Sequence, residues 1–275
     1  MIVSENQLSS ADLPLDLNSI RQRLTGQRLG SEFHYFSEIG STNTYARRLA
    51  EQGGRDGGLV IAESQTHGRG RVGRRWVSPP NVNLYISVVL RPKLRPTGAP
   101  QITLMAAVAL AETLQSFLPV PPSIKWPNDI TINGKKLAGI LTEVNCGTEC
   151  VEFVILGIGV NVNYPVDLMP EEIRQRATSV LVERRNKVSR EDLLWRLIHH
   201  LDRCYGEIEE NGFAPLAPRW EAYFGLRGQR VRVELLDQVA FGIARGIDHD
   251  GALLLEDDHG RLQRVIAGDV IPVSS

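Results

Sequence analysis

The sequence has few cysteines, almost no net charge and no hydrophobic run long enough to cross a membrane. Its 275 residues include three cysteines, an odd number that favours a reduced, cytoplasmic protein over a disulfide framework. The most apolar stretch, 102–114, is interrupted by Thr103 and Glu112 and is shorter than the roughly 20 residues that a transmembrane helix needs. The N-terminus lacks the basic start and apolar core of a signal peptide. We therefore predict a protein that is neither membrane-bound nor secreted.

The charge balance argues against a protein whose main task is to bind nucleic acid. The chain has 31 lysines and arginines against 32 aspartates and glutamates, which gives a net charge of −1. Proteins that bind nucleic acid through its phosphates usually carry a strongly basic balance. Hydrophobic residues make up 42% of the chain and charged residues 23%, so wholesale disorder is excluded.

Hydrophobic spacing predicts a region that mixes helices and strands. Asn133-Gly134 between two apolar runs is a strong signal for a tight β-hairpin, which joins antiparallel strands. We therefore predict an α+β fold with a mixed, largely antiparallel sheet and packed helices. Helical patterns cover 16–24, 41 to the glycines at 53 and 54, 102–117 and the segment after 189, whereas strand patterns cover 59–62, 82–90, 124–126, 130–132, 137–141 and 151–162.

The pattern changes near residue 225. Four short alternating runs follow without a helical period, and turn residues separate them. Several short strands within about 50 residues predict a small β-barrel. The chain thus divides into an N-terminal extension with a short helix (1–36), a main domain (37–224) and a C-terminal barrel (225–275).

The most informative stretch is the glycine- and arginine-rich segment 67–76, which we call the arginine–glycine loop. Its glycines allow the backbone to approach a ligand closely, its arginines suit carboxylate and phosphate, and Trp76 can stack on a base. An exposed basic loop or an RNA-binding segment is the alternative interpretation. The loop is not a P-loop, because no Gly-Lys-Ser/Thr follows it.

Two further stretches contain candidate site residues. In 125–129, Asp129 is a candidate ligand for magnesium, and Lys136 just after the predicted hairpin is a point charge for a carboxylate or phosphate. A surface hairpin with solvated lysines is the alternative. Gly157 and Gly159 alternate in an apolar strand, which indicates the close approach of a ligand or backbone, or a bulge.

Taken in order, these stretches closely resemble the biotin–protein ligases. The resemblance begins near Ser37, includes Ser41-Thr42-Asn43, Gln65, the arginine–glycine loop, 125–129, 136–141 and 157–161, and reaches the C-terminus. It implies the catalytic fold of the class II synthetase-like biotin and lipoate ligases with a C-terminal SH3-like barrel. It also implies that biotin and ATP form biotinyl-5′-AMP, and that biotin then passes to a lysine of a biotin carboxyl carrier protein of acetyl-CoA carboxylase or a related carboxylase.

The resemblance further implies a role for each site residue. ATP and Mg²⁺ are the implied co-substrate and ion, and a homodimer is possible. The implied catalytic residues are Lys136, Arg69 and Arg71. The implied biotin-binding residues are Ser41, Thr42, Asn43, Gln65, Gly68, Arg69, Gly70, Arg71, Lys136, Gly139, Gly157 and Gly159. ATP binding is implied for Arg74, Trp76, Asn128 and Asn161, and metal binding for Asp129.

Some members of the family also carry a DNA-binding domain and act as repressors. Only about 36 residues precede the shared region, fewer than such a domain needs, so we expect no DNA binding. Three alternatives stay open: a lipoate ligase or octanoyl transferase, a nucleic-acid-binding regulator, and a sensor that binds biotin without turnover. A fatty acyl chain needs an apolar tunnel, whereas the ureido ring of biotin needs polar partners such as Ser41, Thr42 and Asn43.

Overall fold

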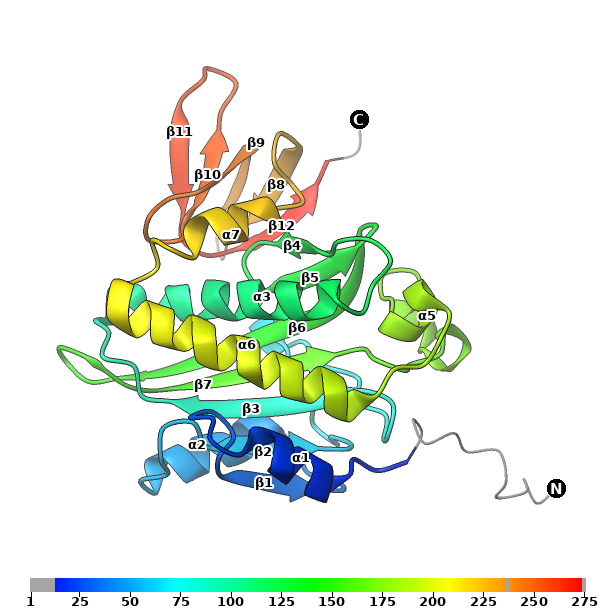
Figure 1. Ribbon diagram of the computed structural model, residues 1–275. Coiled ribbons are helices and arrows are strands. Elements are labelled where there is room, and N and C mark those ends of the chain that lie inside the picture. Colours follow the sequence, from blue (N-terminus) through cyan, green and yellow to red (C-terminus); the bar gives the residue numbers. More distant parts are fainter. Residues whose placement is uncertain (1–12, 236–237, 274–275) are drawn as a thin grey trace.

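The computed structural model describes residues 13–235 and 238–273, so the first twelve residues of the predicted extension lie outside the described part. Figure 1 shows one large sheet with helices packed against it and a smaller sheet at the C-terminal end. The helices are α1 (Leu17–Leu24), α2 (Thr42–Glu51), α3 (Ala99–Gln115), α4 (Glu171–Arg174), α5 (Val180–Arg184), α6 (Arg190–Asn211) and α7 (Ala217–Ala222). None of these helices is long and apolar enough to span a membrane.

The large sheet has seven strands in the order β1-β2-β3-β7-β6-β5-β4. Only β1 and β2 are parallel, and every other neighbouring pair is antiparallel. The predicted α+β class with a mixed, largely antiparallel sheet is therefore confirmed. The strands are β1 (Phe33–Phe36), β2 (Leu59–Ala62), β3 (Leu84–Leu90), β4 (Ser123–Lys125), β5 (Asp129–Ile132), β6 (Lys135–Cys146) and β7 (Val151–Val160).

The C-terminal sheet is antiparallel throughout, in the order β11-β10-β9-β8-β12, as expected for an SH3-like unit. The boundaries drawn at 36/37 and 224/225 stay predictions. Its strands are β8 (Arg230–Glu234), β9 (Val239–Ile247), β10 (Leu253–Glu256), β11 (Leu262–Val265) and β12 (Asp269–Pro272).

The two faces of the large sheet are covered differently. Alternate residues of a strand point to opposite faces. On β7, Val154 and Leu156 belong to the main core, to which α3 and α6 contribute, whereas Phe153 and Ile155 pack with α2 in a second cluster. In Figure 1, α3 and α6 lie side by side in front of the sheet. The short α2 covers only part of its own face and leaves the remainder of that face for a site.

Two strands, β1 and β12, were missed by the sequence patterns. Both lie at the edge of a sheet. β1 is a run of four half-buried residues without alternation, and β12 begins at Asp269 directly after a glycine and ends on Pro272. Each strand is only four residues long and is not flanked by a clear apolar alternation, so neither gave a period-2 signal.

Stability below pH 7 is expected to depend on His200 of α6. Its Nδ1 lies 2.8 Å from Thr113 Oγ1 of α3, and burial, assisted by the nearby Arg203, lowers the pKa of His200. A base with a lowered pKa in the folded state takes up a proton on unfolding, so the stability present above the unfolded pKa of about 6.5 is lost as the pH falls.

The free energy of unfolding should therefore decrease as the pH falls below about 6.5 because of this group. Urea denaturation at several pH values measures the effect. His200→Gln should flatten the profile, whereas His199→Gln, which removes only one of the smaller contributions to the lowered pKa of His200, should change it less. An unchanged profile in His200→Gln would contradict the assignment.

Candidate functional site

Glycines form the floor of the site on the face of the sheet that α2 leaves open. Gly139 of β6 pairs directly with Gly159 of β7. Gly157 and Gly159 point to the same face as Phe153 and Ile155, which pack against α2. Beyond the end of α2, these glycines have no side chains, so they leave space above the sheet.

The indole of Trp76 lies so close to this floor that only glycine fits beneath it at positions 139 and 159. A Cβ atom at Gly159 would be 2.5 Å from Trp76 Cε2, and one at Gly139 would be 3.0 Å from Trp76 Cζ3. The close approach predicted for the glycine strand is thus made by site side chains, because Gly157 similarly accommodates Asn43. The buried Trp76 Nε1 has no hydrogen-bond partner among the described residues, which leaves a donor for a ligand.

A hairpin and a bulge aim Lys136 at the same floor. Asn133 and Gly134 both have positive φ, 49° and 77°, as a type I′ turn requires, so the predicted hairpin is confirmed. Between Ile130 and Thr131 the register of β5 and β6 shifts by one residue. Residues three apart on a regular strand face opposite ways, but this extra residue brings Lys136 to the side of Gly139, where a Cβ would be 3.0 Å from Lys136 Cε.

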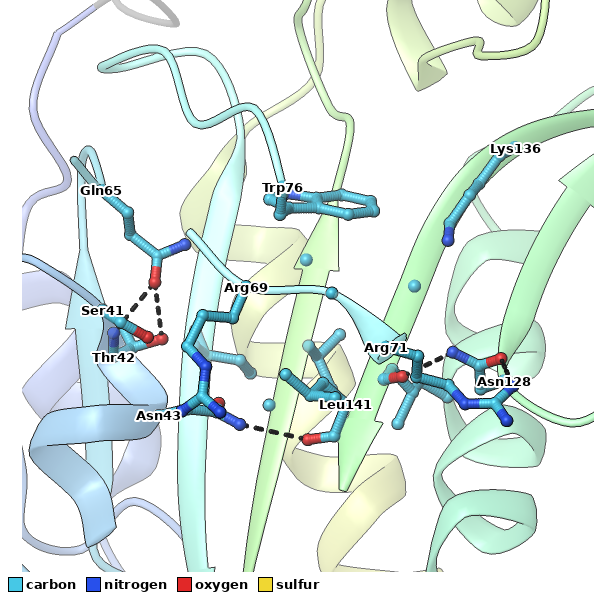
Figure 2. Close-up of a pocket in the computed structure, with 17 residues that line it drawn as sticks. Ser41, Thr42, Asn43, Gln65, Arg69, Arg71, Trp76, Asn128, Lys136 and Leu141 are labelled. Carbon is cyan, nitrogen blue, oxygen red and sulfur yellow. Dashed lines mark hydrogen bonds between the residues drawn. The ribbon is translucent and has the colours of Figure 1, made fainter. Parts of the chain in front are cut away.

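Polar side chains gather at the opposite end of the site (Figure 2). Ser41 begins α2 but makes no side-chain bond to its first turn. Instead, the backbone N–H of Thr42 donates to Gln65 Oε1 at 2.9 Å, and Gln65 Nε2 donates to Ser78 Oγ at 3.1 Å. Asn43 Nδ2 donates to Glu143 Oε2 at 2.9 Å. This end presents hydroxyl and amide groups that are already oriented by one another.

The four cations predicted to bind substrate all contact carboxylates. Four positive and three negative groups leave one net positive charge in this part of the site, before any ligand is counted. Arginines and lysines held in this way are preorganised for an anion. The pairs are Arg69–Glu143 at 2.8 Å, Lys136–Asp129 at 2.6 Å, Arg71–Asp269 at 3.4 Å and Arg74–Asp269.

Two pockets meet at these cations. The first, of about 460 Å³, contains the polar end and the glycine floor. The second, of about 740 Å³, contains Arg74, Asp129 and Asn161. The residues common to the two linings are Gly70, Arg71, Trp76, Asn128 and Lys136.

The structure brings together all the predicted site residues except Gly68. Every other predicted biotin residue lines the first pocket, and every predicted ATP or metal residue lines the second. Gly68 lines neither: a Cβ there would be 2.4 Å from the carbonyl oxygen of Trp76, so this glycine closes the base of the arginine–glycine loop. The roles assigned to these residues stay predictions.

The two predicted ATP-side amides also hold the backbone. Asn128 Nδ2 donates to the carbonyl of Ile140 at 2.7 Å, and Asn128 Oδ1 accepts from Arg71 Nη1 at 3.1 Å. Asn161 Nδ2 donates to the carbonyl of Thr178 at 2.9 Å. Both side chains therefore stabilise the local backbone, in addition to any contact with a ligand.

Asp129 is suited to bind a magnesium ion that arrives bound to the phosphates of a substrate. Mg²⁺ is commonly held by one or two carboxylates together with substrate phosphates. Asp129 supplies one carboxylate to the second pocket, paired with Lys136. Within the described residues, the group of three potential metal ligands is Asp248, His249 and Asp250, which line neither pocket.

Sequence analysis missed three polar residues of the site. Ser87 of β3 donates to Asn43 Oδ1 at 2.6 Å, and Glu143 and Asp269 contact the site arginines. Ser87 had a usable signal, because it is the single polar residue in the apolar run 84–90. Asp269 belongs to the Gly268-Asp269 pair at the C-terminal end of the family resemblance, but no role in the site was predicted for it. Glu143 had no signal, because only the folded chain brings it to the loop.

Comparison with known proteins agrees with this arrangement. The Biotin/lipoate A/B protein ligase family model matches residues 35–161, and the Biotin protein ligase C terminal domain model matches residues 227–271. The chain is 38% identical to the biotin–[acetyl-CoA-carboxylase] ligase of Mycobacterium tuberculosis, over 94% of this chain and 96% of that protein. The chain belongs to the biotin protein ligase family. This confirms the resemblance seen in the sequence.

Other members of the biotin protein ligase family extend the comparison. The bifunctional ligase/repressor BirA of Bacillus subtilis is 36% identical, over 93% of this chain and 78% of that protein. The structure of the Aquifex aeolicus biotin protein ligase in complex with biotin and ATP aligns with a TM-score of 0.75 and 27% identity, over 89% of this chain and 99% of that chain.

Proposed function

We propose that this biotin protein ligase family member joins biotin to ATP and transfers the biotinyl group to a lysine of a carrier protein. The observation that carries the proposal is the shared wall of two pockets, in which Arg71, Lys136 and Trp76 stand between a polar pocket and a second, cation-lined pocket. An acid in the first and a nucleotide in the second would meet at the cations. The Aquifex relative is described in complex with both ligands.

In the first step, a carboxylate oxygen of biotin attacks the α-phosphorus of ATP, and the bond to pyrophosphate breaks. Two anions must approach, so cations that neutralise them lower the barrier. We assign Arg69 and Arg71 to the biotin carboxylate and the phosphate, and Lys136 to the charge on the transferring phosphate. The carboxylate is already ionised, so this step requires no general base.

In the second step, the amine of the carrier lysine attacks the acyl carbon of the adenylate, AMP leaves, and the amine loses a proton. The mixed anhydride must be protected from water meanwhile. A glycine-rich loop that folds over the adenylate provides that protection. We assign this role to the arginine–glycine loop, which borders both pockets through Gly70 and Arg71.

At the ends of the substrates, we assign Ser41, Thr42, Asn43 and Gln65 to the ureido ring of biotin, and Trp76 and Asn161 to adenosine. Asp129 would hold magnesium from the protein side, where the ion would neutralise phosphate charge. The hydrogen-bonding residues of the first pocket favour biotin over a fatty acyl chain, which has no polar group along its length. The absence of operator binding, a homodimer, a cytoplasmic location and the identity of the carrier stay predictions.

Biotin-dependent exchange of labelled pyrophosphate into ATP tests the first step. Purified protein with magnesium should catalyse exchange with biotin and not with lipoate or octanoate. Addition of a biotin carboxyl carrier domain should then give a product heavier by one biotinyl group in mass spectrometry. Exchange driven by lipoate would assign the chain to the sister activity, and no exchange by folded protein with either acid would contradict a ligase function.

A further inference from the structure

A carboxylate of the C-terminal sheet contacts the arginine–glycine loop at the point where the two pockets meet. Asp269 opens β12, and its Oδ1 lies 3.4 Å from Arg71 Nη1. Its other oxygen pairs with Arg74 Nη2. The carbonyl of the preceding Gly268 accepts from the Arg71 guanidinium at 3.4 Å. Two consecutive residues of the C-terminal sheet thus hold two arginines assigned to substrate.

Asp269 is placed rigidly by its sheet. It pairs with Glu234 of β8 in an antiparallel ladder. Gly268 has a φ of +145°, and a Cβ there would be 2.7 Å from Val233 Cγ1 and 2.9 Å from the carbonyl oxygen of Glu234, so only glycine allows this approach to β8. Because the strand is already paired, the position of this carboxylate adds little ordering entropy to the cost of ligand binding.

The loop that Asp269 contacts contains a strained backbone and exposed side chains. Val72 has a φ of 52° and ψ of 43°, a left-handed conformation that is unfavourable for a β-branched residue, and its side chain is 77% exposed. Arg74 is also largely exposed, with 67% of its side chain accessible, and Asp269 is its recorded ion-pair partner. Without that partner, ordering Arg74 on ligand binding would cost side-chain entropy.

The contact leaves donors for substrate. Arginine has five N–H groups. Arg71 uses its two terminal nitrogens toward Asn128, Gly268 and Asp269, while Nε has no recorded partner. The ion pair of Arg74 involves Nη2. A phosphate can therefore bind the remaining N–H groups while Asp269 stays in place.

We propose that Asp269 is a positioning residue for the nucleotide half-reaction: from the C-terminal sheet, it holds the Arg71 and Arg74 guanidiniums where the phosphates of ATP bind. This inference rests on the proposed ligase function. It assigns to the C-terminal sheet a part in the ATP step. The acid pocket should depend on it less, because Asp269 does not line that pocket and only one of its two arginine partners, Arg71, does.

Steady-state pyrophosphate exchange by Asp269→Asn tests the proposal. The KM for ATP should rise about tenfold, as expected when a charge-assisted contact that orders a binding group is lost. The KM for biotin should rise less than the KM for ATP, because Arg71 lines the biotin pocket but Arg74 does not. Asp269→Glu should recover part of the loss. Asp258→Asn is the control, because Asp258 lies in the turn between β10 and β11 of the same sheet and pairs with Arg230 at 2.8 Å, away from the loop.

A double-mutant cycle with Arg74→Ala separates positioning from a general loss of structure. If Asp269 acts through Arg74, Asp269→Asn should have a clearly smaller effect on the KM for ATP in the Arg74→Ala background. Fully additive effects, an unchanged KM, or a lower KM in Asp269→Asn would overturn the proposal. If Asp269→Asn does not fold, Asp269→Glu and Arg74→Ala still give the comparison. Exchange by the unmodified protein is the separate check on the ligase function.

Discussion

Lys136→Ala is expected to lower the rate of biotinyl-adenylate formation by about 10²–10³-fold, the usual effect of removing one preorganised group that stabilises transition-state charge. Lys136 Nζ stands 2.6 Å from Asp129 Oδ1 and 5.3 Å from the centre of the Trp76 ring, and the residue lines both pockets. No other lysine lines either pocket among the described residues, so a neighbouring ammonium cannot take its place.

The bulge in β6 makes the effect specific to this lysine. Lys135 precedes it on the same strand and is exposed, so Lys135→Ala tests the loss of one positive charge beside the turn without touching the site. We expect Lys135→Ala to retain normal exchange. Lys136→Arg keeps the charge but replaces a compact ammonium with a planar guanidinium, and it should recover only part of the rate. Single-turnover measurements at saturating biotin and ATP give the comparison, and equal rates for the two alanine variants would contradict the assigned role.

The sequence was sufficient to predict those parts of the site in which a short segment contains both the reactive residue and the turn or glycines that position it. The hairpin at Asn133-Gly134 could be predicted because both residues tolerate a positive φ, and it determines where β6 begins, one residue before Lys136. The glycines of β7 predicted a close approach of another group, and the groups that approach them are the side chains of Trp76 and Asn43.

The carboxylates that neutralise the site were unreadable for a physical reason. Glu143 reaches Arg69 across 74 positions of sequence, and Asp269 reaches Arg71 across 198. Such pairs depend on sheet order and on how the C-terminal sheet meets the loop, and no local pattern encodes either. The resemblance included the pair Gly268-Asp269, but it did not indicate that this carboxylate contacts the arginines of the loop.

Breaking the buried ion pair between Glu63 and Arg190 is expected to have the largest effect on stability. Both side chains are 2% exposed, and Arg190 Nη1 lies 2.6 Å from Glu63 Oε2. The same carboxylate accepts from the backbone N–H of Leu15 at 2.6 Å and from Tyr35 Oη at 3.0 Å. Burial, together with the charge of Glu63, raises the pKa of Tyr35 to about 12, so this hydroxyl stays a donor at neutral pH.

Glu63→Leu should therefore lower the free energy of unfolding by about 3–5 kcal/mol, because it leaves an uncompensated guanidinium in the core. Urea denaturation measures the change. Glu51→Ala, which removes an exposed partner 3.8 Å from Arg47, is the control and should change the free energy by about 0.5 kcal/mol or less.

The double variant Glu63→Leu/Arg190→Met distinguishes the cost of an unpaired charge from the loss of a favourable pair. If burial of a lone ion is what destabilises the single variant, removing the second ion should restore much of the lost stability, although the carbonyls of Leu13 and Asn83 would lose their donor. A double variant no more stable than Glu63→Leu would instead mean that the pair itself, with its hydrogen bonds from the segment before α1, contributes the stability. Because Glu63 directly follows β2 and Arg190 begins α6, that outcome would mean that the pair contributes to joining β2, α6 and the segment before α1.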